Sequence, residues 1–206
     1  NSSNNNGAGT LTIGSATTPS AAGLTTSKVI NLAGTTNGAT INASQPGANP
    51  VIFNAAAFTA SGAGAKTLTL GGTNTADNII NSVIVDNAAG TNNTSLAKTG
   101  SGTWVLAGAN TYSGSTTISN GTLKLKANAA TTSTVVGEAA TNTVVFNANT
   151  AAGTAGGTLE LVGFSGSATT ETLGALTPTA GAATVKLTAN SVGASATNLA
   201  FTSLGA

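Results

Sequence analysis

The feature that most constrains the fold is a five-residue pattern that recurs along the chain. In this pattern a threonine is followed by an apolar, a variable and an apolar residue, so the apolar side chains fall on one face of a strand. The six copies are Gly9–Ile13, Lys66–Leu70, Gly102–Leu106, Gly121–Leu125, Gly157–Leu161 and Ala183–Leu187. No stretch shows the periodicity of an amphipathic helix, and the β-branched residues favour strands.

The spacing of the copies indicates a stacked repeat. Their threonines lie at positions 10, 67, 103, 122, 158 and 184, and the first four intervals, 57, 36, 19 and 36 residues, are close to multiples of about 19. The last interval, 26 residues, does not fit, so the loops must differ in length. Residues 64–75 support the period, because they match residues 100–111 at six of twelve positions. Such a period with short strands and Gly or Asn turns is typical of a solenoid.

The pattern therefore predicts an all-β chain, a parallel β-helix or β-solenoid-like stack with little or no helix. Stacked rungs satisfy each other's backbone groups at a spacing of about 4.8 Å. The alternative is an antiparallel β-sandwich, which is favoured if the uneven intervals reflect hairpins. Thr103 and Thr122 distinguish the two folds, because they are neighbours in the solenoid and lie on opposite sheets in the sandwich.

The composition fits such a stack and excludes several classes of function. Ala, Thr, Gly and Asn make up 128 of the 206 residues, and only six Lys and five acidic residues are charged. Stacking places like residues on like, which favours Thr and Asn ladders over charged ones. The chain has no His, Cys or Arg, so it lacks thiolate metal sites, the commonest general base and the guanidinium fork that binds phosphate.

The composition also bears on the partners and the location of the protein. Six scattered lysines form no basic footprint for nucleic acid, and no apolar run approaches the ~18 residues of a membrane helix. A chain without Cys and Met suits an exposed extracellular protein, because those side chains are the ones that oxidation damages.

One window resembles a known family. Residues 96–125 read LAKTGSGTWVLAGANTYSGSTTISNGTLKL. This resembles the autotransporter-associated β-strand repeat of bacterial surface proteins, whose pattern is L-x-K-x-G-x-G-T-L-x-L-x-G-x-N-T-Y-x-G-x-T-x-I-x-x-G-T-L-x-L. Trp104 stands where the pattern usually has Leu, on the same inward face. Residues 64–75 match the first half of the pattern, without its Asn-Thr-Tyr end.

The resemblance implies an exported bacterial protein, extracellular or at the cell surface, with a right-handed parallel β-helix passenger. It implies no activity, because no catalytic residue belongs to the pattern. We expect a flexible N-terminal segment at residues 1–7 and a single β-solenoid-like domain over residues 8–206, either complete or part of a longer chain.

The acidic residues are the first candidates for a functional site. Asp77 and Asp86 could bind a hard cation, but they lack Asp-x-Asp spacing, and solvated loop acids are the simpler interpretation. Glu160 and Glu171 could form an acid–base pair for glycoside chemistry. Glu160 alternates with apolar residues, so we expect it on the outward face, isolated and without a His, an Arg or an aromatic platform for sugars.

Threonines and aromatic residues are the second set of candidates. Residues 10–12 and 67–69 could be rungs of an ice-binding face, although ordinary outward threonines are the simpler interpretation. The other copies of the pattern interrupt such a face with Val105, Lys124, Glu160 and Lys186. Trp104 and Tyr112 could stack on sugar rings, but Trp104 replaces a core Leu and Tyr112 lies at a bend, so we expect both to pack inside.

Several asparagines are turn or modification candidates. Asn37-Gly38 and Asn120-Gly121 are tight-turn dipeptides. Asn42-Ala43-Ser44 and Asn92-Asn93-Thr94 match the glycosylation pattern, which is weak evidence in so Asn- and Thr-rich a chain.

The sequence therefore predicts a non-enzymatic, extracellular structural or adhesive surface protein with no catalytic, cofactor or metal site and no cofactor. Neither end reads as a solenoid cap, so we expect either self-association into filaments or a surface layer, or neighbouring domains of a longer chain. Surface glycans are further candidate partners, whereas nucleic acid and membrane insertion are not expected. The alternatives are a passive stalk or adhesin passenger that presents a separate domain, and, disfavoured by the missing residues, a polysaccharide-acting β-helix enzyme.

Overall fold

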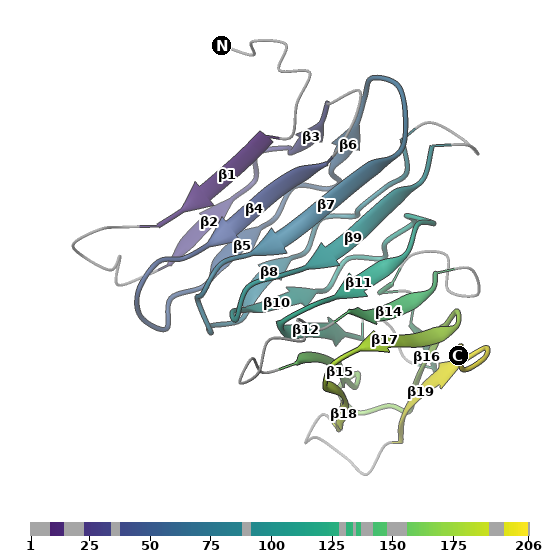
Figure 1. Ribbon diagram of the computed structural model, residues 1–206. Helices are drawn as coiled ribbons and strands as arrows, with labels where there is room; N and C mark the ends of the chain where they lie inside the picture. The colour runs from purple at the N-terminus through teal and green to yellow at the C-terminus, as the bar shows by residue number, and fades with distance from the viewer. Residues whose placement is uncertain are drawn as a thin grey trace.

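The computed structural model describes residues 9–14, 23–33, 38–87, 92–127, 131–133, 135–136, 142–147, 156–189 and 196–205. Over these residues the chain forms strands and no helix, as Figure 1 shows. Within the same residues no helix is long and apolar enough to cross a lipid bilayer. The all-β prediction is confirmed, and the segment 1–7, predicted to be flexible, lies outside the described residues.

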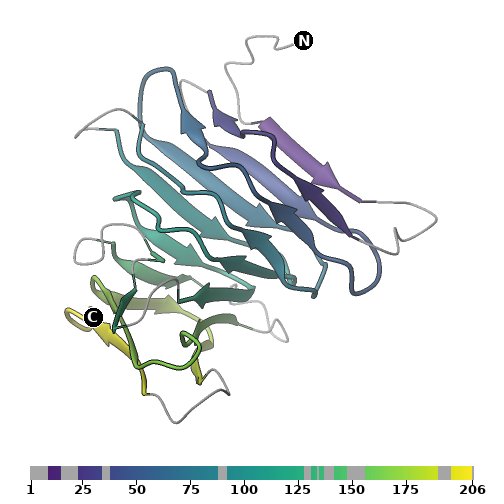
Figure 2. The ribbon, with the colours of Figure 1, turned by 180° about the vertical axis from the view of Figure 1, so that it is seen from behind.

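Two seven-stranded parallel sheets form the long walls of a solenoid. Sheet A consists of β1 (Gly9–Ile13), β4 (Ala39–Ala43), β7 (Lys66–Gly71), β9 (Thr94–Lys98), β11 (Thr116–Ile118), β14 (Val144–Asn147) and β17 (Leu176–Ala180). Sheet B consists of β2 (Leu24–Thr26), β5 (Val51–Phe53), β8 (Asn78–Ile80), β10 (Thr103–Leu106), β12 (Gly121–Lys126), β15 (Gly157–Val162) and β18 (Ala183–Thr188). Sheet A faces the viewer in Figure 1, and sheet B does so in Figure 2.

Two smaller sheets make a third side of the stack. At the N-terminal end β3 (Asn31–Leu32) pairs with β6 (Thr59–Ala60). At the C-terminal end β16 (Thr169–Leu173) lies between β13 (Thr131–Ser133) and β19 (Thr197–Phe201). All pairings among the described strands are parallel, so the β-solenoid prediction is confirmed and the antiparallel sandwich is wrong.

The register confirms the stacking prediction but corrects the predicted repeat length. Thr103 pairs with Thr122, as expected for neighbouring rungs. Thr122 then pairs with Thr158, and Thr158 with Thr184, so intervals of 19, 36 and 26 residues each correspond to one turn. The interval of 36 between Thr122 and Thr158 is therefore one turn with a long loop and not two turns of 19. Strand pairing fixes the height of a rung, whereas the loop between rungs can have any length that closes.

The self-match between residues 64–75 and 100–111 has a different origin from the one predicted. The first segment contains β7 of sheet A, and the second contains β10 of sheet B. The two segments therefore do not stack in the predicted register: the N–H groups of Gly102 and Thr103 donate to the carbonyls of Gly72 and Asn74, which are 30 and 29 residues earlier and not 36. Their sequences are alike because each segment contains a strand that buries one face and then bends at glycine.

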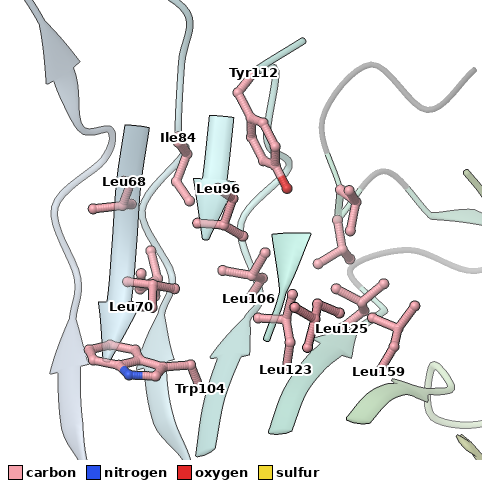
Figure 3. Packing of buried hydrophobic residues seen from close by; sticks show 14 of the residues in the cluster. Leu68, Leu70, Ile84, Leu96, Trp104, Leu106, Tyr112, Leu123, Leu125 and Leu159 are labelled. Atoms are coloured by element: carbon pink, nitrogen blue, oxygen red, sulfur yellow. The ribbon is translucent and has the colours of Figure 1, made fainter. Parts of the chain in front are cut away.

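Columns of inward side chains fill the space between the walls. Leu106, Leu125 and Leu161 follow one another in register, and each has an exposed fraction of 0%. Figure 3 shows Leu106, Leu123, Leu125 and Leu159 of sheet B following one another, with Leu96 of sheet A beside Leu106. Burying one Leu side chain contributes about 1.5–3 kcal/mol, so the column rather than any single turn holds the stack together.

The core residues become exposed at both ends of the stack. Leu11 on β1 and Leu24 on β2 are 44% and 43% exposed at one end, and Leu187 on β18 is 51% exposed at the other. A shallow apolar hollow of about 240 Å³ opens beside β1, lined by Gly9, Thr10, Leu11, Ile30, Ala39, Thr40 and Ile41.

Candidate functional site

The lysine of the repeat pattern, Lys98, is buried at the end of β9. It alternates with Leu96, so it lies on the inward face, and its exposed fraction is 0%. Its Nζ donates hydrogen bonds to the carbonyl oxygens of Thr99, Gly100 and Asn120 at 2.7, 2.8 and 3.0 Å. Thr99 and Gly100 follow β9, whereas Asn120 lies in the bend before β12. The ammonium group therefore joins two successive bends of the solenoid.

Gly121 closes the cradle around this lysine. Its φ is +67°, and a Cβ at this position would lie 2.5 Å from the carbonyl oxygens of Gly100 and Gly102, so only glycine fits. This places the predicted Asn120-Gly121 turn at the bend between β11 and β12. Burial lowers the pKa of Lys98 to about 8. The three carbonyl acceptors favour the charged form, and the fully buried group leaves no room for a substrate.

A buried polar network lies where β11 meets β14. The hydroxyls of Tyr112 and Thr116 are 2.9 Å apart, and Thr116 donates to Oδ1 of Asn142 at 2.8 Å. Asn142 donates in turn to the carbonyl of Gly114. Burial raises the pKa of the Tyr112 hydroxyl above its ordinary range; the bond to Thr116 opposes this shift and the charge of Glu171 adds to it. Tyr112 is 0% exposed, which confirms the prediction that it packs inside and leaves it unable to stack on a sugar.

Glu171 also points into the core, from β16. It is 0% exposed, and its Oε1 accepts hydrogen bonds from the backbone N–H groups of Val135 and Val136, both at 3.0 Å. Glu160 lies on a different sheet and faces outward. The two glutamates therefore do not form the acid–base pair that the sequence left open, because the wall of the solenoid separates them.

Glu160 occupies the outward position predicted for it, but the prediction that it is isolated is wrong. It stands between Lys124 and Lys186 in the register of sheet B. Its Oε1 lies 2.8 Å from Nζ of Lys186 and accepts a hydrogen bond from Thr188, and the residue is 5% exposed. Burial raises the pKa of Glu160, but the hydrogen bonds from Lys186 and Thr188 and the charges of both lysines outweigh it and hold the pKa below its usual value.

The two aspartates have different roles. Asp77 extends the charged row, because its Oδ1 lies 2.7 Å from Nζ of Lys124 at the surface. Asp86 is half-buried and accepts hydrogen bonds from the N–H groups of Thr94 and Ser113, at 2.7 and 3.0 Å, and from the Ser113 hydroxyl at 2.6 Å. The prediction of a solvated loop acid is therefore wrong for Asp86. Among the described residues, no three His, Cys, Asp or Glu side chains gather closely enough to hold a metal ion.

Trp104 lies in the core, as predicted from its place in the repeat. It is 0% exposed, its Nε1 donates to the carbonyl of Gly71 at 2.9 Å, and its ring stacks on Phe53 with centroids 6.3 Å apart. The sugar-stacking alternative is wrong for this residue, because neither face of the indole reaches the surface.

The outward faces of the two sheets differ in charge. Residues 10–12 and 67–69, the hypothetical ice-binding rungs, belong to sheet A. The residues that were expected to interrupt the face, Val105, Lys124, Glu160 and Lys186, all belong to sheet B. The interruption predicted from the sequence therefore does not occur on sheet A.

The modification and turn candidates lie in ordinary surroundings. Asn42 is half-buried within β4, and Asn92 is half-buried beside the exposed Asn93. Asn37, from the other turn dipeptide, lies outside the described residues.

Sequence reasoning missed a set of buried asparagines that bond neighbouring turns. Their exposed fractions are 3% or less, and the set comprises Asn74, Asn78, Asn87, Asn110 and Asn142. Asn110 shows the principle: its Oδ1 accepts from the N–H of Ile84 at 2.8 Å, and its amide group donates to the carbonyl of Val135. The signal was an Asn in the inward phase of the period-two alternation.

Comparison with known proteins identifies one part of the chain. Residues 96–125 match the family described as the passenger-associated-transport-repeat. The chain is also 52% identical over 61 residues to the adhesin BmaC autotransporter of Brucella suis biovar 1 (strain 1330), over 30% of this chain and 2% of that protein. No solved structure matches the chain. Residues 96–125, with the Lys98 cradle and the buried Trp104 and Tyr112, are thus a passenger-associated-transport repeat of the autotransporter type, as the sequence predicted.

Proposed function

We propose that this chain is part of the non-enzymatic, adhesive stem of a bacterial surface passenger. The observation that carries the proposal is the repeat at residues 96–125, whose strands β9 to β12 form two stacked rungs of a parallel solenoid. The similarity to a segment of an autotransporter adhesin supports the same reading. A parallel solenoid suits this task because each turn adds a fixed rise of about 4.8 Å and projects material away from the cell.

The polar groups of the repeat support a structural role for it. Lys98, Tyr112 and Thr116 are all buried, and they bond Asn120, one another and, through Thr116, Asn142 of the next turn. A catalytic acid, base or nucleophile must reach its substrate, and none of these side chains can do so. The outward Glu160 is already held by Lys186 and Thr188.

Surface exposure is tested on bacteria that make the protein. Antibodies raised against the 206-residue chain are used to follow the antigen after intact cells are treated with protease. We expect the antigen to be degraded while a periplasmic marker protein stays intact. An antigen that is protected until the cells are lysed would contradict surface display.

The adhesive and non-enzymatic parts of the proposal have separate tests. Antibody fragments that bind the chain should reduce attachment of the bacteria to host or abiotic surfaces, whereas fragments of unrelated specificity should not. Turnover of a polysaccharide or peptide by the purified chain, lost in a Glu160→Gln or Glu171→Gln variant that still folds, would show an enzyme instead.

A further inference from the structure

The outward face of sheet A is uncharged across all seven strands. One column of residues runs through it in register: Thr10, Thr40, Thr69, Ala97, Thr117, Val145 and Thr177. The lysines of this sheet, Lys66 and Lys98, point inward and are 1% and 0% exposed. Among the described residues, the outward charges of the two walls, Lys124, Lys126, Glu160 and Lys186, lie on sheet B.

The neighbouring columns on sheet A have the same character. Two residues further along the strands, Thr12 pairs with Asn42, and two residues earlier Thr67 pairs with Ser95. These outward residues are hydroxyl, amide or small apolar side chains, and most are half-buried by their neighbours in the columns. Such a surface carries no charge whose desolvation would oppose contact, and its hydroxyl groups can donate and accept across an interface.

The shape of sheet A decides what this face can contact. Figure 1 shows the strand direction turning steadily from β1 to β17. A flat crystal plane, such as an ice surface, cannot contact the whole face of a twisted sheet. A second twisted sheet can, because two such sheets pack face to face about 10 Å apart at an angle near 30°.

The area is sufficient for a weak, specific contact. Seven strands about 4.8 Å apart and about three outward positions along each strand make a face of roughly 30 by 20 Å. Two copies would bury about 1,200 Å² in total, which is at the low end for specific interfaces. The face lacks the Trp, Tyr and Arg anchors that carry most binding energy, so a dissociation constant on the order of 0.1–1 mM is expected.

We propose that the outward face of sheet A is a self-association surface, on which sheet A of a second copy packs face to face. Because the same face serves both copies, the contact is isologous and closes as a pair. The proposal extends the adhesive function above by naming its partner, since many copies on facing cells would turn a weak contact into firm attachment between cells. The biological role of this contact rests on the proposed function, whereas the contact itself can be measured on the isolated chain.

Two matched lysine variants test the surface. Thr117→Lys places a charge in the central column of sheet A, and Thr158→Lys places the same charge at a half-buried outward position of sheet B. Sedimentation of the 206-residue chain is measured over a concentration series up to the millimolar range. We expect reversible dimers for the parent chain and for Thr158→Lys. In Thr117→Lys, where the contact would desolvate a lysine on each copy, dimerisation should weaken at least tenfold, about 1.4 kcal/mol.

A third variant separates this contact from end-to-end stacking. Leu187→Lys alters the exposed C-terminal edge and leaves sheet A unchanged, so it should dimerise like the parent chain. Circular dichroism and the fluorescence of Trp104 establish that each variant is folded. A parent chain that stays monomeric throughout, an equal effect of the two threonine variants, or association lost only in Leu187→Lys would each overturn the proposal. None of these results would bear on whether the protein is displayed at the cell surface.

Discussion

Replacing Asn78 by Asp tests whether buried asparagines hold adjacent turns together. Asn78 begins β8 and is 0% exposed. Its Oδ1 accepts from the N–H of Val51 on β5 at 2.9 Å, and its Nδ2 donates to the carbonyl of Thr103 on β10 at 2.8 Å. The same amide group also contacts the carbonyls of Asn74 and Ala76 at 3.2 and 3.1 Å. One side chain thus bonds the strands on both sides of its own.

The substitution keeps the shape of the side chain and removes its two donor hydrogens. Each lost bond costs about 1 kcal/mol net, and an ionised carboxylate facing carbonyl oxygens adds the cost of an uncompensated buried charge. We expect the free energy of unfolding at pH 7 to fall by about 3–5 kcal/mol, a large part of the 5–15 kcal/mol typical of a domain.

The loss in the variant should depend on pH in a known direction. Burial and the facing carbonyls raise the folded-state pKa of the new carboxyl above its unfolded value of about 3.9. The folded state then binds more protons than the unfolded state between these two pKa values. The variant is therefore least destabilised near pH 4 and loses stability as the pH rises through the folded-state pKa.

Denaturant titrations followed by tryptophan fluorescence provide the measurement. Trp104 is the one tryptophan of the chain and pairs in register with Asn78, so its emission reports on this turn. Asn81→Asp is the matched control, because Asn81 is exposed and its side chain donates to the side chain of Asn54 at 2.6 Å. The control should change stability by no more than about 0.5 kcal/mol. Equal stability of the two variants at pH 7, or no pH dependence of their difference, would refute the reasoning.

Three further predictions concern the effect of Lys98, Trp104 and Glu160 on the stability of the fold. Burial lowers the pKa of Lys98 to about 8, so above that pH the unfolded chain binds more protons than the folded chain, and the free energy of unfolding should rise between pH 8 and 10. Above that range it should fall, because the buried Tyr112 keeps a proton that the unfolded chain releases. Denaturant midpoints that fall steadily as the pH rises from 8 would contradict this prediction. Trp104→Leu restores the usual residue of the repeat but leaves a cavity and an unbonded carbonyl at Gly71, so calorimetry should show a loss of about 2–3 kcal/mol. Glu160→Gln should cost at most about 1 kcal/mol at pH 7, because the partnering lysine is largely exposed. That cost should vanish as the pH falls through the depressed pKa of Glu160, and a cost independent of pH would show that the charge has no role.

The strands were predictable because alternation is a local property. Each of the six pentads contributes a strand with the expected residues on its inward face. These residues are buried from Leu68 and Leu70 on β7 to Leu159 and Leu161 on β15, and they are exposed only in the first and last pentads, at the ends of the stack. The assignment of pentads to sheets was not predictable, because it depends on how each loop closes. The 36-residue interval between Thr122 and Thr158 is one turn, and nothing in the two pentads themselves reveals it.

The buried polar groups were missed because residue type was given more weight than position. Lys98 falls in the inward phase of β9, two residues after Leu96, so the alternation itself predicted burial. Because lysine is almost never fully buried, this general tendency was given more weight than the alternation, and the burial of Lys98 was not predicted. Glu160 shows the opposite case, since its outward position was predicted, whereas the lysines that flank it come from strands whose register was unknown.

These buried groups explain how so repetitive a sequence selects one register. Columns of Leu, Thr and Ala tolerate a slip of two residues between rungs, because a slip of two keeps the same faces in and out. A slip would separate Lys98 from the carbonyl of Asn120, and Asn78 from Val51 and Thr103. Each separation would leave a buried charge or amide without partners, at a cost of several kcal/mol. The apolar columns therefore supply most of the stabilisation, and the buried Lys and Asn side chains determine which rungs may pair. This division of roles also accounts for the unequal turns, since a polar clamp specifies its partner in the next turn whatever the length of the loop between them.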